Sequence, residues 1–151
     1  MARGTQIAFD VFSEAPGETI HNLTPTTGDT IKVALVSNTA ATLGAQTNLS
    51  ALTEVTGGTE YVAGGATSAI TAWSRTGAVT SLGLSDVSWA QDASGPQDIR
   101  CAVVWNSSKV GQDDLLTYID LTLDGTTPVD LQAAPLAIDL STNPPIVSTR
   151  S

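Results

Sequence analysis

The sequence is poor in residue types on which many protein functions depend. Its 151 residues include one cysteine, one histidine and two lysines. A single cysteine, Cys101, excludes an intramolecular disulfide, so packing and assembly must stabilise the fold. Because Cys101 lies in an alternating apolar run between Ile99 and Trp105, we predict a small buried thiol at this position.

Positive charge is scarce and scattered. Six Lys and Arg residues stand against fifteen Asp and Glu residues, which gives a formal net charge of −9 at pH 7. Nucleic-acid binding relies on clustered Lys and Arg side chains that neutralise phosphates. No such basic patch exists in the sequence, so we predict no direct nucleic-acid partner. The arginines are Arg3, Arg75, Arg100 and Arg150.

Long apolar segments are also absent. No stretch approaches the ~18 consecutive apolar residues of a membrane span. Residues 1–12 hold one arginine and lack the long apolar core of a signal peptide. We therefore predict no membrane partner and a soluble chain that is made in a cytoplasm.

Apolar and polar residues alternate along much of the sequence. The alternation runs through residues 7–11, 31–35 and 115–123, and each run has one apolar face. A period of two with one apolar face is typical of half-buried β-strands. We therefore predict strands over these runs, with the side chain of Leu123 on the same apolar face as Leu115.

Two further runs change the phase of their alternation. Residues 79–90 change phase near Ser85-Asp86, which predicts a bulge or a tight bend. Residues 129–140 change phase at Ala134-Pro135, where the proline favours an edge strand or a crossover.

Turn-forming residues separate these runs, and threonine and β-branched residues are frequent within them. Short strands with this punctuation predict an all-β fold, an antiparallel β-sandwich or barrel with extended terminal arms. Helix should be scarce, with one turn of helix expected within residues 48–55. The turns are expected at residues 25–29, 57–58, 64–65, 94–96 and 124–128.

The length suits one domain, and no repeat or internal boundary divides it. We predict a single β domain over residues 1–140 and an extended C-terminal arm over residues 141–151. The arm has no alternation that continues a strand, and Pro144-Pro145 favours polyproline geometry. Two alternatives stay open for it: a frayed tail, or an arm that orders against a neighbouring subunit.

Short motifs follow one another in a distinctive order. The first motifs are Ile20-His21-Asn22-Leu23 and the strand from Asp29 to Leu35. They are followed by Leu52-Thr53-Glu54-Val55, Tyr61 and Gly64-Gly65. The last motifs are Asp86 to Ala90 and Ile99 to Trp105. This order resembles a family of small tailed-bacteriophage virion proteins, over roughly Ile20 to Leu140. The motif residues are typical of turns and strand faces, and they form no catalytic signature.

The resemblance implies a particle component without catalysis. Small size, acidity and extended termini suit a capsid decoration (cement) protein that binds between capsid subunits and stabilises the head. Its partners would be the major capsid protein and copies of itself, and its location the virion, assembled in the host cytoplasm. One alternative is a tail or head-to-tail structural component. Another is a carbohydrate-binding or adhesin module, although aromatic residues at 5% of the chain would furnish a sugar cleft poorly.

The residues that could carry chemistry have plainer explanations. His21 lacks an evident nucleophile and orienting acid, and no Gly-x-Ser-x-Gly elbow is present, so we predict a turn or strand-edge residue and no catalytic residues. Asp113 and Asp114 could offer oxygen ligands to Ca²⁺, but no EF-hand loop is present. We predict no metal and no cofactor. Gly57-Gly58 and Gly64-Gly65 predict turns rather than a phosphate loop.

The tryptophans divide between core and surface. Trp89 and Trp105 are in phase with neighbouring valines, which predicts burial. Trp73 stands among polar residues and, with Arg75, is a candidate for a subunit contact. The arm supplies the other candidates for this contact, which are Pro144, Pro145, Ile146 and Val147.

Overall fold

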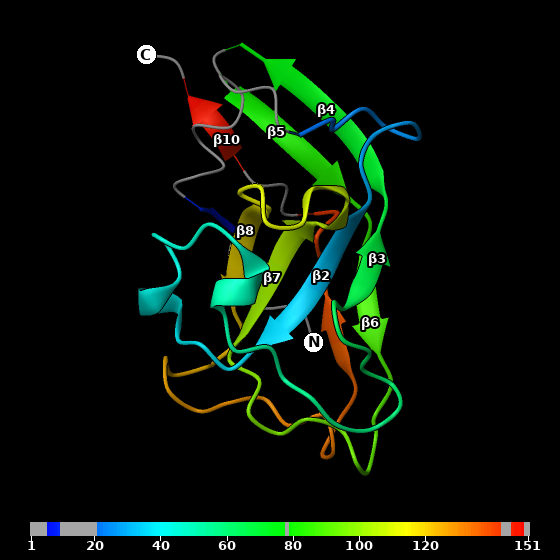
Figure 1. Cartoon of the computed structure of the whole chain (residues 1–151), viewed down its shortest axis with the longest axis vertical. Coiled ribbons are helices and arrows are strands. Elements are labelled where there is room, and N and C mark those ends of the chain that lie inside the picture. Colours follow the sequence, from blue (N-terminus) through cyan, green and yellow to red (C-terminus); the bar gives the residue numbers. More distant parts are fainter. Residues whose placement is uncertain (1–5, 10–20, 78, 143–145, 150–151) are drawn as a thin grey trace.

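The computed structural model describes residues 6–9, 21–77, 79–142 and 146–149 (Figure 1). Its regular elements are antiparallel strands and short 3-10 turns. The predicted all-β class is therefore confirmed. The choice between a sandwich and a barrel stays a prediction.

Five strands form the central sheet, in the order β1-β8-β7-β2-β3. All its pairings are antiparallel. The strands are β1 (Ile7–Ala8), β2 (Ile31–Val36), β3 (Ala66–Ser68), β7 (Cys101–Asn106) and β8 (Leu115–Asp120).

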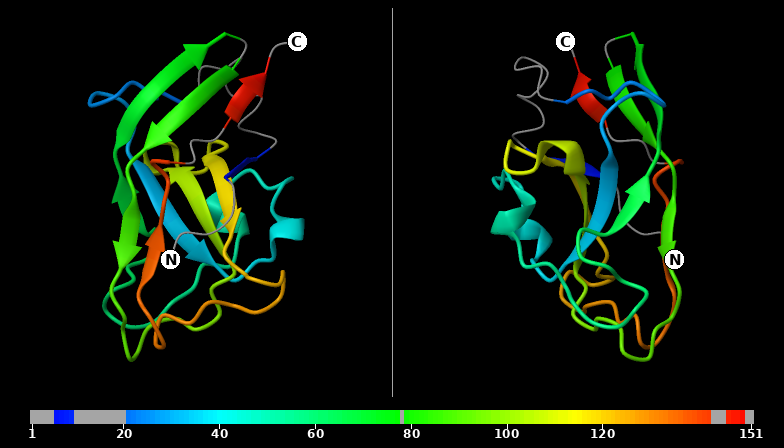
Figure 2. Two further views of the ribbon diagram at one scale, coloured as in Figure 1. Left: turned by 180° about the vertical axis from the view of Figure 1, so that it is seen from behind. Right: turned by 45° about the vertical axis from the view of Figure 1, so that its right-hand side comes forward.

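Two smaller sheets flank the central one. A three-stranded sheet has the order β10-β5-β4, and β6 pairs with β9. In Figure 2 the β4–β5 hairpin and β10 stand together at one end of the molecule. The strands are β4 (Ile70–Thr76), β5 (Val79–Leu84), β6 (Val87–Trp89), β9 (Leu136–Ile138) and β10 (Ile146–Thr149).

Helical structure in the described residues is limited to three 3-10 turns. These are η1 (Ala40–Thr42), η2 (Leu49–Ala51) and η3 (Ser107–Lys109). The second lies inside residues 48–55, where the sequence predicts a turn of helix. No helix in the described part of the chain has the length and apolar character needed to cross a lipid bilayer.

The central sheet is buried on both faces. Every residue of β7 is buried, and so are Ala34 and Val36 of β2. The prediction of a half-buried strand over 31–35 is therefore wrong. The alternation correctly identified one buried face of the strand. The small and β-branched residues on the other face are buried as well, because a second layer covers them.

Each face of the sheet belongs to its own hydrophobic cluster. The main core lies between the central sheet and strands β5, β6 and β9. The second core lies on the opposite face, packed against Ala40, Leu49 and Leu52. Its buried members are Phe9, Ala34, Val36, Leu43, Cys101, Val103, Trp105, Leu115 and Tyr118. The main core includes Ile31, Val33, Leu35, Leu82, Leu84, Val87, Trp89, Leu116, Ile119, Leu136 and Ile138.

The predicted phase changes mark passages between sheets. Ser85 and Asp86 separate β5 from β6, which belong to different sheets. The Asp86 carboxylate fixes this bend, because its Oδ1 accepts hydrogen bonds from the N–H groups of Leu140 and Ser141 at 2.9 and 2.8 Å. Ala134-Pro135 comes immediately before β9, which pairs with β6 alone among the described strands.

Strand β8 departs from the predicted alternation. The register against β7 shifts between Val104 and Trp105, so that Leu115 packs in the second core while Leu116 and Ile119 pack in the main core. The bulge reverses the face of every residue before it. Leu123 lies beyond the strand and is 80% exposed, so its predicted place on the apolar face is wrong.

The C-terminal arm contains a strand that the sequence pattern did not indicate. Residues 146–149 form β10, which pairs with β5 of the same chain through a register shift between Ile146 and Ser148. Such an irregular strand has no continuous period of two. The absence of a strand in the arm is therefore a wrong prediction, while its contact with a neighbouring subunit stays a prediction.

Two leucines, Leu116 at the start of β8 and Leu123 beyond its end, test these core assignments. Leu116→Ala should lower the free energy of unfolding by about 2–5 kcal/mol, because a fully buried side chain is lost and a cavity is left. Leu123→Ala is the matched control and should change it by less than about 0.5 kcal/mol. Urea denaturation of both variants measures the difference. Equal losses would contradict the placement of Leu116 in the core.

Candidate functional site

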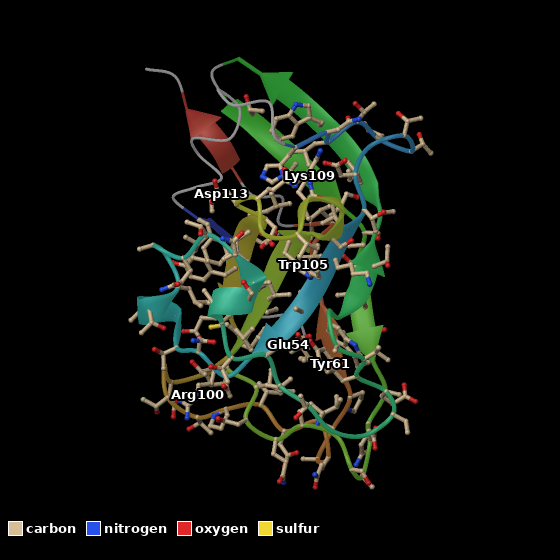
Figure 3. All side chains as sticks on the ribbon, in the orientation of Figure 1. Glu54, Tyr61, Arg100, Trp105, Lys109 and Asp113 are labelled. Atoms are coloured by element: carbon tan, nitrogen blue, oxygen red, sulfur yellow. The ribbon has the colours of Figure 1, made fainter. Side chains whose placement is uncertain are left out.

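The motif residues Glu54, Tyr61 and Gly64 meet Trp105 in one hydrogen-bonded group, here called the tyrosine lock (Figure 3). Buried Tyr61 donates its hydroxyl to Glu54 Oε1 at 2.6 Å and accepts the N–H of Leu35 at 2.9 Å. The same Glu54 oxygen accepts the Gly64 N–H at 2.5 Å. Trp105 Nε1 donates to the Gly64 carbonyl at 2.9 Å. The lock thus fastens the loop after Glu54 onto β2 and β7.

Glycine is required beside the lock. Gly64 and Gly65 have φ values of +88° and +79°, a region that other residues rarely adopt. A Cβ atom on Gly65 would lie 1.7 Å from the Val33 carbonyl oxygen. The predicted turn at this pair is confirmed, and its second glycine lets the loop backbone approach β2.

The chemistry of Tyr61 suits a structural role. Burial, together with its hydrogen bond to Glu54, raises the pKa of the Tyr61 hydroxyl far above its ordinary value of 10.0. The hydroxyl therefore stays protonated and acts as a fixed donor.

His21 belongs to a second group that includes Asp29 and Asn106. Asn106 Oδ1 accepts the N–H of Ser108, so the atom 2.9 Å from His21 Nδ1 is the amide Nδ2. That amide also donates to Asp29 Oδ2 at 2.7 Å. His21 Nδ1 must therefore accept a hydrogen bond, which places the proton of the neutral ring on Nε2. The group ties residues 21–29 to the end of β7, in keeping with the predicted structural role of His21.

Aspartates that could have been metal ligands instead bind backbone N–H groups. Buried Asp114 accepts from Leu49 and Gly111, both at 2.8 Å. Asp92 accepts from Thr59 and Glu60 at 2.6 and 3.0 Å, and the hydrogen bonds from backbone groups lower its pKa. Among the described residues no group of three or more His, Cys, Asp or Glu side chains is arranged to hold a metal ion.

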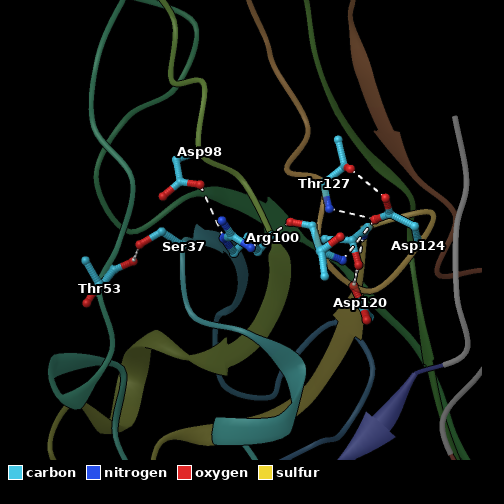
Figure 4. Close-up of polar contacts among 9 residues, drawn as sticks. Ser37, Thr53, Asp98, Arg100, Asp120, Asp124 and Thr127 are labelled. Carbon is cyan, nitrogen blue, oxygen red and sulfur yellow. Dashed lines mark hydrogen bonds and ion pairs between the residues drawn. The ribbon is translucent and has the colours of Figure 1, made fainter.

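Arg100 lies among loops at the opposite end of the molecule from β4 (Figures 1 and 3), and Figure 4 shows its polar contacts. Its Nη1 donates to the Thr126 carbonyl at 2.7 Å, and its Nε lies 3.3 Å from Asp98 Oδ1. Nearby, Asp124 accepts from the hydroxyl and the N–H of Thr127, and these bonds lower the pKa of the Asp124 carboxyl. The Arg100 side chain thus serves loop structure rather than an open anion site.

The buried thiol and tryptophans predicted from the sequence are confirmed. Cys101 is fully buried, and burial raises the pKa of its thiol to about 12. Trp89 and Trp105 are 5% and 8% exposed. Reaction of the thiol with solutes is therefore suppressed, because only the thiolate is nucleophilic.

The predicted subunit contacts lie at the end formed by the three-stranded sheet. Trp73 is 39% exposed on β4, and Arg75 lies two residues further along the same strand. Ile146 and Val147 lie in β10. The side chains of Arg75, Ile146 and Val147, and all of Pro144 and Pro145, fall outside the described residues. The structure thus places Trp73, Arg75, Ile146 and Val147 in one sheet, an arrangement that the sequence did not indicate.

Two open cavities were not indicated by the sequence. One, of about 240 Å³, lies between residues 24–31 and residues 67–70, and the other, of about 230 Å³, lies between residues 121–123 and 127–134. Each is lined by a single carboxylate, Asp29 in the first and Asp130 in the second. Neither cavity brings together a pair of groups for acid–base or nucleophilic chemistry.

Comparison of the chain with protein-family models, with curated proteins and with solved structures gives no match. The candidate site rests on the geometry of the chain itself. Its three parts are the tyrosine lock, the His21 group and the exposed strand β4 of the three-stranded sheet.

The tyrosine lock can be tested with two glutamates of the same loop region. Glu54→Ala should lower the free energy of unfolding by about 1–3 kcal/mol, because the Tyr61 hydroxyl and the Gly64 N–H lose their acceptor. Glu60→Ala, at an exposed residue, should change it by less than about 0.5 kcal/mol. The double variant with Glu54→Ala and Tyr61→Phe should lose less unfolding free energy than the sum of the losses in the two single variants, because both changes remove the same hydrogen bond. Full additivity in denaturant unfolding would show that the two side chains act separately.

Stability should also depend on pH through His21. Burial lowers the pKa of His21 below its ordinary value of 6.5, despite the opposing effect of Asp29. In the window just below 6.5 the unfolded chain binds a proton that the folded chain does not. Unfolding free energy should then fall as pH falls, by at most about 1.4 kcal/mol per pH unit.

His21→Gln should remove this dependence between about pH 7.5 and about pH 5.5. Carboxylates with lowered pKa values, such as Asp86 and Asp92, lose their contribution to the unfolding free energy only at pH values below this window. Urea titrations at a series of pH values measure the slope. An unchanged slope in His21→Gln would assign the dependence to other groups.

Proposed function

We propose that this chain is a structural protein of a tailed-bacteriophage virion, and specifically a capsid decoration (cement) protein that binds between capsid subunits. Its partners are the major capsid protein and copies of itself. It acts by occupying a site on the particle and carries out no reaction. The virion is its place of action, after assembly in the host cytoplasm.

One observation carries the proposal. The residues of the motifs on which the resemblance to virion proteins rests are the ones that fasten loops to the sheets. His21 and Asp29 join Asn106, and Glu54 joins Tyr61 and Gly64. A family signature made of such residues specifies a rigid scaffold, which is what a particle component must supply.

The surface chemistry supports the same role. A net charge of −9 keeps the chain away from packaged DNA. The carboxylates of Asp114 and Asp92 accept hydrogen bonds from backbone N–H groups, and neither the cavity at Asp29 nor the one at Asp130 holds a second carboxylate. Both features suit a protein that binds other proteins on the outside of a shell.

Particles lacking this chain provide the test. Purified chain, fluorescently labelled, should bind such particles saturably, and electron cryomicroscopy should place its density on the head between capsid subunits. Bound chain should raise the temperature at which heated particles release DNA. The matched control is tails separated from heads, which should bind none. Absence of the chain from purified virions, or density confined to the tail, would overturn the proposal.

A further inference from the structure

The three-stranded sheet has an open edge. In the order β10-β5-β4, strand β4 has a hydrogen-bonded neighbour on one side only among the described strands. Alternate residues along such an edge turn their backbone N–H and C=O groups outward. Figures 1 and 2 show β4 extending beyond the central sheet, with the segment that leads into β2 crossing beside it.

Strand β4 has little of the usual protection of edge strands, namely one charged residue, Arg75, and a register irregularity between Ile70 and Ala72. Proteins normally blunt an edge by keeping it short, by adding charges or proline, or by covering it. The other described edges are short, since β1 has two residues and β3 has three. With seven residues, β4 is the longest described strand, and it contains no proline. Its side chains at Thr71, Trp73, Ser74 and Thr76 are all exposed, whereas Ile70 at its start packs against the main core.

Charge indicates which partner this edge suits. Residues 66–85 contain no Asp or Glu and one Arg, and β10 contains no charged residue, although the chain has fifteen acids. Two copies that each carry a charge of −9 repel one another over most of their surfaces. The acid-free sheet is where they can approach with the least repulsion.

We propose that two copies of this chain associate through antiparallel pairing of their β4 edges, about a two-fold axis at Trp73. This pairing places Trp73 opposite its equivalent and Arg75 opposite Thr71, so like charges do not face each other. Trp73 supplies an exposed aromatic anchor at the centre. The inference specifies how copies of the chain, which the proposed function already names as partners, contact one another, and its test uses the free chain in solution without particles.

Cysteine substitution along β4 tests the pairing directly. The native thiol, Cys101, is buried and its pKa is raised, so it does not compete. Directly opposed residues in an antiparallel pair have Cβ atoms about 4.5–5.5 Å apart, close enough for a disulfide after a small adjustment. Trp73→Cys should therefore form disulfide-linked dimers under mild oxidation. The exposed control Val62→Cys should stay monomeric, and Thr71→Cys should cross-link far less than Trp73→Cys.

Sedimentation of the unmodified chain supplies the second measurement. A dimer of the 15.5 kDa chain should form, and it should tighten with added salt because the repulsion between like charges is screened. Trp73→Lys should raise the dissociation constant of the dimer at least about tenfold, because a lysine on an edge strand disfavours strand pairing. Leu123→Lys should leave the dissociation constant unchanged. Circular dichroism checks that both variants fold.

Three outcomes would overturn the proposal. They are a chain that stays monomeric at every concentration, a dimer that Trp73→Lys does not weaken, and equal cross-linking of Trp73→Cys and Val62→Cys. A monomeric chain that nevertheless binds particles would reject the pairing and leave the virion role intact.

Discussion

Hydrogen bonds from backbone N–H groups to carboxylate oxygens hold the loops of this chain against its sheets. Glu54, Asp92 and Asp114 each accept such bonds from loop residues. A loop packed on a sheet must find acceptors for its N–H groups, because a buried donor without one costs about 1–3 kcal/mol. Acidic residues therefore stabilise the loops, besides giving the chain its net charge of −9.

These bonds explain how the central sheet can be covered on both faces with so little helix. The second core is closed by Leu43, Leu49 and Leu52, which lie in a segment of 3-10 turns and loops. Asp114 accepts the Leu49 N–H and Asn48 accepts the Asp113 N–H, so this segment is fixed to the loop before β8. Cys101 and Trp105 are buried because this segment covers them.

The two ends of the molecule have different chemistry. At one end, loops carry Asp92, Asp98 and Asp124, and their carboxylates bind neighbouring backbone or Arg100. At the other end the three-stranded sheet carries no carboxylate. The molecule therefore has an acidic end formed by loops and an acid-free strand edge that carries Arg75.

The sequence by itself determined the β class, the turn at Gly64-Gly65 and the burial of Trp105, because alternation and turn chemistry are local properties. It also placed His21, Glu54 and Tyr61 in one ordered series of motifs. Only the tertiary structure decided their partners, since Asn106 lies 85 residues from His21 and Leu49 lies 65 residues from Asp114. It also decided the burial of Ala34, the bulge in β8 and the pairing of β10 with β5. Periodicity reports which residues share a strand face, but the layer that covers that face and the register across it depend on segments far away in the chain.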